Sequence, residues 1–399
     1  MRFRAATIAT LLAVLPAITD ALGAIEVDFS LGNGSALNLS ADTTTFSQQN
    51  TLGLGLRAPF TSEAELRVGV TGSFVSADGA TPQLGLSVDQ LLFSVESLTD
   101  PGLASLNLGR LAVAEPTGIV ANLPADGVRI GLITPRTTWE LTAAYTGLPI
   151  GVGQSERRAQ WIGTATVAFP ELFARQSIIA TLTGATAAPG LDGNVPESFL
   201  TAYGSLVLTG PISTQTFYTV FGVLSLFDGV LDGIARDGVS GAAGLSLRHY
   251  FQDPWDTAIL VDTGLATGGD LPFRPLTNTS LAELLPGVFG NVVGIDVLFT
   301  TKPVSFGGSD RLGVSPRLGA RLLARLEEGP GTIAGLDTAT AAGIVGTEAE
   351  LGVEIRPSSD VRIGASGIVA IPTDLPVTGG VLADTSPLGR IGIDLEVSF

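Results

Sequence analysis

The chain has 399 residues, of which 45% are hydrophobic and only 15% are charged, with no cysteine and a formal net charge of -17. The absence of cysteine excludes a disulfide scaffold and thiolate metal sites. The acidic balance argues against nucleic-acid partners, which require a basic surface. A soluble domain carries about a quarter charged residues, so the low charge and the mean hydropathy of +0.42 do not fit an ordinary soluble enzyme.

The first 24 residues have the three parts of a secretory signal peptide. A short basic start, 1–4, precedes an apolar run over 5–18, and small residues at 21–24 supply a cleavage site. This arrangement predicts export and removal of 1–24, which leaves 25–399 as one domain. Later in the chain we find no uninterrupted apolar run of the roughly 18 residues that a transmembrane helix needs.

Hydrophobic residues recur with a period of two through the rest of the chain. The last segment is the clearest case, because Ile391, Ile393, Leu395, Val397 and Phe399 alternate with polar residues or glycine. This pattern is typical of a strand with one apolar and one polar face. The same alternation is found in 65–70, 139–143, 293–299, 349–355 and 361–366.

The connections distinguish a soluble sandwich from a membrane barrel, since both contain alternating strands. Short links are expected at 59–63, 135–137, 170–175, 210–211, 253–256 and 357–360. Long links are expected at 113–125, 147–159, 187–197, 228–238, 266–290, 327–345 and 372–386. Short turns at one end and long loops at the other predict an all-β fold, a closed antiparallel transmembrane β-barrel with periplasmic turns and extracellular loops.

About 18 strands of membrane-spanning length follow from this division, an even count as in single-chain bacterial barrels. We place them at 25–32, 51–58, 64–74, 84–96, 103–111, 126–134, 137–146, 160–169, 176–186, 198–209, 212–226, 239–251, 257–266, 291–302, 309–325, 347–356, 360–371 and 387–399. The segment 33–50 is ambiguous between a strand and a loop, so a count of about 16 stays open.

The tail Gly389-Arg390-Ile391-Gly392-Ile393-Asp394-Leu395-Glu396-Val397-Ser398-Phe399 resembles the C-terminal signal of Gram-negative outer-membrane β-barrels. That resemblance implies recognition of Ile393, Leu395, Val397 and Phe399 by the barrel-assembly machinery, and insertion among the lipids of the outer membrane of a diderm bacterium. By size the chain is similar to a porin, which leaves a homotrimer open as an assembly.

Strand parity predicts which charged residues face the lumen. If Leu312, Leu318 and Leu322 face lipid, an arginine row faces inward beside an acidic row on the next strands. The arginine row comprises Arg311, Arg317, Arg321 and Arg325. The neighbouring strands add Glu348, Glu350, Glu354, Arg356, Arg362, Asp394 and Glu396. Further inward charges are Arg67, Arg129, Glu140 and Asp296.

Two interpretations of these rows stay open. The functional one is a transverse field across a pore constriction that steers polar or charged solutes. The structural one is a set of cross-strand ion pairs that stabilise the wall. Because both signs occur, ion selectivity is left open.

The longest connection, 266–290, carries the capping-box sequence Ser280-Leu281-Ala282-Glu283, which predicts a short helix. The sequence leaves open whether this loop folds into the lumen or caps the barrel from outside.

Catalysis has little support in the sequence. His249 is the only histidine, no Gly-x-Ser-x-Gly segment occurs, and no motif indicates a metal or cofactor. We therefore expect a porin-like channel, not an enzyme, that passes small hydrophilic solutes or ions by passive diffusion. The alternative is a structural or surface-interaction barrel whose loops bind a partner. The two differ in whether the folded protein conducts ions across a planar bilayer.

Overall fold

The structure is a computed structural model and consists of strands. It describes residues 25–40, 43–148, 151–152, 159–173, 175–188, 198–231, 234–252, 257–268, 271, 273–277, 291–301, 304–305, 313–326, 343–358, 360–372 and 387–398. The segment 1–24, with its predicted signal peptide, and Phe399 lie outside the described residues, as do Arg311, the turn at 253–256 and the predicted helix near Ser280. Among the described residues, no helix is long and apolar enough to cross a membrane.

Eighteen long strands and two strands of two residues are present in the described part of the chain. The strands are β1(Glu26–Leu39), β2(Thr44–Pro59), β3(Ala64–Ala77), β4(Gln83–Thr99), β5(Gly102–Ala114), β6(Asn122–Ile133), β7(Thr138–Tyr145), β8(Gly151–Val152), β9(Gln160–Phe173), β10(Gln176–Ala187), β11(Phe199–Pro211), β12(Thr216–Leu231), β13(Ile234–Tyr250), β14(Ala258–Ala266), β15(Val292–Thr300), β16(Val304–Ser305), β17(Gly313–Arg325), β18(Gly343–Ser358), β19(Val361–Pro372) and β20(Leu388–Ser398).

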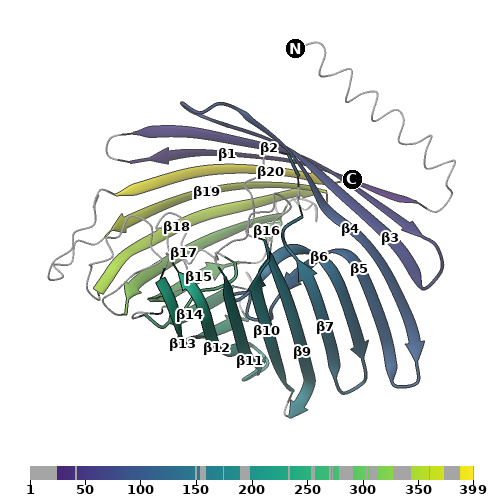
Figure 1. Cartoon of the computed structure of the whole chain (residues 1–399). Coiled ribbons are helices and arrows are strands. Elements are labelled where there is room, and N and C mark those ends of the chain that lie inside the picture. The colour runs from purple at the N-terminus through teal and green to yellow at the C-terminus, as the bar shows by residue number, and fades with distance from the viewer. Residues whose placement is uncertain are drawn as a thin grey trace.

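The sheet closes on itself. Each long strand pairs antiparallel with the long strands before and after it, and β20 pairs with β1 from Ser30↔Ser398 to Leu39↔Gly389. Figure 1 shows the last strand beside the first in one continuous wall. Closure removes both sheet edges, which is the condition for a sheet to cross hydrocarbon. The predicted closed antiparallel barrel and the count of eighteen long strands are confirmed.

The outer face is apolar, as the period-two pattern predicted. On β20, Ile391 and Ile393 are 54% and 55% exposed, and on β10 and β12 Leu182 and Leu224 are exposed as well. A water-soluble protein rarely exposes so much contiguous apolar surface. The outer face therefore suits lipid, and the alternate residues face the lumen.

Short turns gather at one end of the barrel, with the start of β1 and the end of β20, and we call this the turn end. The links β2–β3, β6–β7, β11–β12 and β18–β19 are short there, as predicted. The opposite, loop end holds most of the long connections. One of them was predicted wrongly: β12 continues to Leu231 and β13 starts at Ile234, so 228–238 is a tight hairpin with Asp228 opposite Asp237. The ambiguous segment 33–50 mostly extends β1 and β2.

A β-bulge keeps β4 apolar on the outside. Gly69 pairs with Gln90 and Val70 pairs with Val88, so Asp89 is an extra residue without a partner in the ladder. One extra residue reverses the inward–outward alternation. Leu84 and Leu86 before the bulge, with Leu91 after it, are all exposed although their parities differ.

The ladder between β4 and β5 is interrupted toward the loop end. It runs only from Leu92↔Gly109 to Thr99↔Gly102, and the β4 segment beyond it pairs with β8 instead. Arg110 lies at the gap in the ladder, between the part of β4 that pairs with β5 and the part that pairs with β8. Its Nη1 donates to the Val88 carbonyl at 2.6 Å, while Nε and Nη2 donate to the two Asp126 carboxylate oxygens at 3.0 and 2.8 Å. The side chain thus satisfies a carbonyl that a neighbouring strand would otherwise bond.

We predict that Arg110→Met destabilises the barrel by about 3–5 kcal/mol, because it leaves Asp126 partly buried without its cation. Arg57→Met is the matched control: Arg57 also bonds two carboxylates, but its side chain is 48% exposed, so the unfolding midpoint should change little. Denaturant unfolding in lipid vesicles, followed by tryptophan fluorescence, measures both. Equal midpoints for the two variants would contradict the role assigned to Arg110.

Candidate functional site in the barrel lumen

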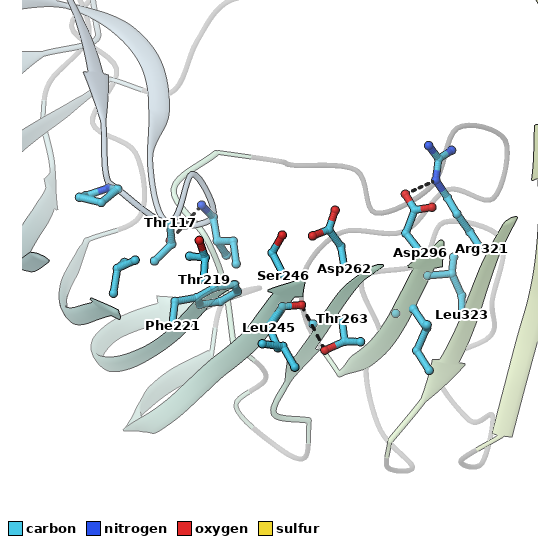
Figure 2. A pocket seen from close by; sticks show the side chains of 16 residues that line it. Thr117, Thr219, Phe221, Leu245, Ser246, Asp262, Thr263, Asp296, Arg321 and Leu323 are labelled. Atoms are coloured by element: carbon cyan, nitrogen blue, oxygen red, sulfur yellow. Dashed lines mark hydrogen bonds and ion pairs between the residues drawn. The ribbon is translucent and has the colours of Figure 1, made fainter. Parts of the chain in front are cut away.

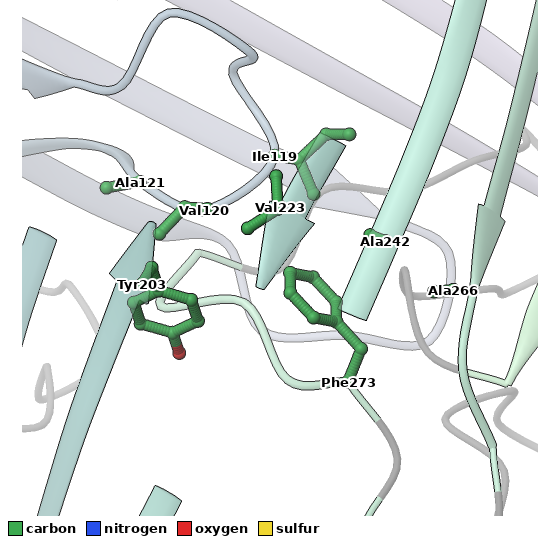
Figure 3. Close-up of a cluster of buried hydrophobic side chains, with 8 residues drawn as sticks. All are labelled: Ile119, Val120, Ala121, Tyr203, Val223, Ala242, Ala266 and Phe273. Atoms are coloured by element: carbon green, nitrogen blue, oxygen red, sulfur yellow. The ribbon is translucent and has the colours of Figure 1, made fainter. Parts of the chain in front are cut away.

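The connection between β5 and β6 folds into the barrel and reaches the far wall. Its residues Ile119, Val120 and Ala121 are at most 6% exposed. They pack against inward-facing side chains of β11 to β14, although β7, β9 and β10 separate those strands from β6 along the sheet (Figure 3). The partners on the wall are Tyr203, Val223, Ala242 and Ala266. We call residues 115–121 the inner loop.

Part of the connection between β14 and β15 holds the inner loop in place. Phe273 is fully buried in the same cluster. The Leu276 amide donates to the Val120 carbonyl at 2.8 Å, and the Asn122 amide donates to Thr277 Oγ1 at 2.8 Å. The Tyr203 hydroxyl donates to the Arg274 carbonyl at 2.6 Å. The described part of 266–290 therefore lies inside the barrel, which resolves for that part the alternative that the sequence left open.

The spacing of strands predicts only a long loop over 113–125, and the inward position of the inner loop is a finding of the structure. The sequence does contain Ile119-Val120-Ala121, an uninterrupted apolar run, within this segment. Apolar loop residues are stabilised by removal from water, and in a wide barrel they can be buried against the inner wall. This apolar run is the sequence feature from which an inward-folded loop could have been predicted.

A cavity of about 430 Å³ lies between the inner loop and the wall of β11 to β17. Thr117 and Ile119 line it from the loop, and residues of six strands line it from the wall. Figure 2 shows Ser246, Asp262 and Asp296 on neighbouring strands with their side chains on one side of the sheet, while Leu245 and Thr263 lie on the other side. The wall of the cavity thus carries polar and charged side chains beside apolar ones such as Phe221 and Leu323.

Arg321 is the centre of an ion network beside this cavity. Its Nε donates to Asp296 Oδ2 at 2.9 Å, Nη2 lies 3.2 Å from Glu350 Oε2, and Nη1 lies 3.5 Å from Glu348 Oε2. Arg317 Nε lies 3.2 Å from Glu350 Oε1. The Arg321 and Glu348 side chains are 12% and 1% exposed. Cross-strand register causes the contacts, because Arg321 is opposite both Asp296 and Glu348.

The charged groups of the network and of Asp262, which also lines the cavity, are four carboxylates and two guanidinium groups. The carboxylates belong to Asp262, Asp296, Glu348 and Glu350, and the guanidinium groups to Arg317 and Arg321. The group therefore carries an excess of two negative charges. A confined site with walls of low dielectric constant strengthens such a field relative to open water. Its chemical capacity is to attract cations and to orient polar solutes.

Other predicted site residues form separate pairs. Near the turn end, Glu354 bonds Arg356 at 2.6 Å, and Arg362 lies 3.7 Å from both Glu354 and Glu396. These side chains are 35% to 59% exposed. Asp394 is on the same face and joins no ion pair in the described residues. This group does not contact Arg321, so the predicted row is divided into two clusters.

The remaining predicted charges lie elsewhere on the inner wall. Arg129 Nε lies 3.2 Å from Glu140 Oε1 across β6 and β7, and Arg67 bonds Glu65 on β3. Arg325 is 4% exposed and lies four residues from Arg321 on β17.

His249 lies near the turn end, where its Nδ1 is 2.9 Å from Thr216 Oγ1 and its ring packs edge-on against Phe251.

We predict that Val120→Cys reacts with a hydrophilic maleimide at least about tenfold more slowly than Asp100→Cys, because a fully buried thiol must wait for local opening. Asp100 is in the exposed β4–β5 turn, and the chain has no native cysteine to add background. Adding Phe273→Ala should accelerate labelling at position 120 by removing its cover. Equal rates for the two single variants would show that the inner loop is not packed in the lumen.

The sequence matches no protein family model and no curated protein. Several solved structures from Pseudomonas aeruginosa have the same fold. OccK5 (OpdH) is 10% identical with a TM-score of 0.59, and 95% of this chain and 99% of that chain are covered. OccK1 (OpdK) is 12% identical with a TM-score of 0.57, covering 95% and 100%. OpdK with vanillate is 11% identical with a TM-score of 0.56, covering 94% and 99%. At these identities the similarity shows a common fold, from the first strand to the last.

Proposed function

We propose that this protein is an outer-membrane channel through which small hydrophilic solutes or ions diffuse passively. The observation that carries the proposal is the combination of an apolar outer face with a polar, charged lumen. Among the described residues, two inward-folded segments narrow this lumen and leave a cavity of about 430 Å³ beside them. A barrel stabilised by lipid outside needs no packed interior, so its interior is available for transport.

The structural neighbours support this proposal. OpdK from Pseudomonas aeruginosa is described as an outer membrane protein. The lengths of OccK5 and OccK1 are matched almost completely. A structure of OpdK with vanillate, a small aromatic carboxylate, illustrates the size of solute that a barrel of this kind accommodates.

Export and assembly belong to the same proposal. The segment 1–24 would direct secretion and be removed, and the tail with Ile393, Leu395 and Val397 on its outer face would be recognised by the barrel-assembly machinery. Ile391, Ile393 and Leu395 are exposed on one side of β20, which leaves this face accessible to a partner during insertion. A homotrimer is the assembly proposed by analogy with porins.

The first test is conductance of the folded mature chain in a planar bilayer. We expect discrete steps of reproducible size in KCl. Refolded protein that shows strand circular dichroism but never conducts would contradict the channel proposal and favour a barrel whose external loops bind a partner.

The second test concerns the ion network. With two excess carboxylates at the cavity, the wild-type channel should be cation-selective in a KCl gradient. Arg321→Gln removes the central positive charge and should shift the reversal potential further toward the cation value. Arg317→Gln, whose side chain is 45% exposed, gives a smaller shift in the same direction and remains informative if Arg321→Gln folds poorly. Unchanged reversal potentials in both variants would leave these residues with only a structural role.

A further inference from the structure

The cavity beside the inner loop has an apolar surface next to a charged one. Ile119 from the loop, with Phe221 and Leu323 from the wall, provides hydrocarbon and an aromatic ring. Ile119 and Leu323 are 6% and 1% exposed, and Phe221 packs against the buried cluster. A volume of about 430 Å³ is in the range of pockets that hold small organic ligands. The cavity therefore suits a solute with a compact apolar body.

The charged surface contains two carboxylates that oppose each other. Asp262 on β14 is directly opposite Asp296 on β15, and like charges at such a position, with Cβ atoms about 5 Å apart, repel. Asp262 forms no hydrogen bond or ion pair with the described residues. Oδ1 of Asp296 is buried and has no hydrogen-bond partner among them. Both side chains face the cavity (Figure 2).

Arg321 does not offset this charge for an incoming solute. It is the only cationic side chain among the described residues that line the cavity, and three carboxylates already surround it. An anion would have to compete with Glu348 and Glu350 for the guanidinium group and approach Asp262 at the same time. A cation instead relieves the repulsion between Asp262 and Asp296.

We propose that this cavity binds small organic cations, with an ammonium group between Asp262 and Asp296 and an apolar or aromatic body against Phe221 and Ile119. The inference rests on the proposed channel function and names the class of solute that the channel selects. Ser246, opposite Asp262 on β13, supplies a hydroxyl acceptor at the edge of the ammonium site. The aromatic ring of Phe221 adds apolar contact for the body of the ligand.

Calorimetric titration of the full mature chain in detergent micelles tests binding without requiring conductance. Benzylammonium, benzoate and benzyl alcohol share one ring and differ in charge. We expect benzylammonium to bind at least about tenfold more tightly than the other two, the size of effect that one charge-assisted contact gives. Equal affinities for the three compounds, or no heat of binding for benzylammonium, would overturn the proposal.

Asp262→Asn is the decisive variant, because Asp262 has no described partner whose loss would disturb the fold. We expect about a tenfold loss of benzylammonium affinity. Asp100→Asn removes the same charge from an exposed turn and should leave the affinity unchanged. If Asp262→Asn binds benzylammonium as tightly as the wild type, the assigned ammonium site is wrong.

Single-channel recording separates this inference from the proposed function. Benzylammonium should reduce the KCl current of the wild-type channel at concentrations that leave Asp262→Asn unaffected. Normal conductance without this block would overturn the cation site and leave the channel intact. Absence of conductance together with calorimetric binding would overturn the channel function and retain the site.

Discussion

Closure of the backbone ladder between β1 and β20 is the constraint on which the rest of the structure depends. In hydrocarbon an unpaired amide or carbonyl group costs several kcal/mol, so the sheet has to end where it began. Ten register pairs from Ser30↔Ser398 to Leu39↔Gly389 achieve this. Where β4 and β5 separate, other groups complete the pairing: β8 adds backbone at Leu86 and Ser87, and Arg110 bonds the Val88 carbonyl. A guanidinium group replaces a strand there because it offers several donors in a fixed plane.

Two kinds of hydrophobic burial coexist in this molecule. Outside, leucines and isoleucines such as Leu182 and Ile393 are exposed on the protein and would be covered by lipid. Inside, apolar residues of the inner loop pack in a cluster with Tyr203, Val223 and Phe273. The hydrophobic effect stabilises this small core, because it removes apolar surface from the water in the lumen. The interior core does not hold the barrel together. It positions the inner loop opposite the charged wall and so defines the space between them.

The sequence predicted those features that depend on local pattern. Alternation at Ile391, Ile393 and Leu395 was enough to identify a strand and its outer face. Parity placed the arginine row beside the acidic row, and the register of the structure then pairs Arg321 with Glu348. The hairpin at Leu231 and Ile234 was missed because Asp228, Gly229, Asp237 and Gly238 indicate turns, whereas the ladder accommodates them in paired positions. The position of the inner loop could not be predicted, since Val120 is buried in one cluster with Tyr203 and Phe273, which are far away in sequence. The cavity is formed by those distant contacts, and no local pattern encodes it.

The facing carboxylates of Asp262 and Asp296 also have a consequence that depends on the salt around the barrel. The reach of a fixed charge through water is set by dissolved salt, with a Debye length of about 30 Å at 0.01 M and about 8 Å at 0.15 M. In dilute fresh water the pair would influence ions along much of the passage, whereas in brine its field would end within the cavity itself. The same wall would therefore attract cations over a long range at low ionic strength, and only at direct contact at high ionic strength.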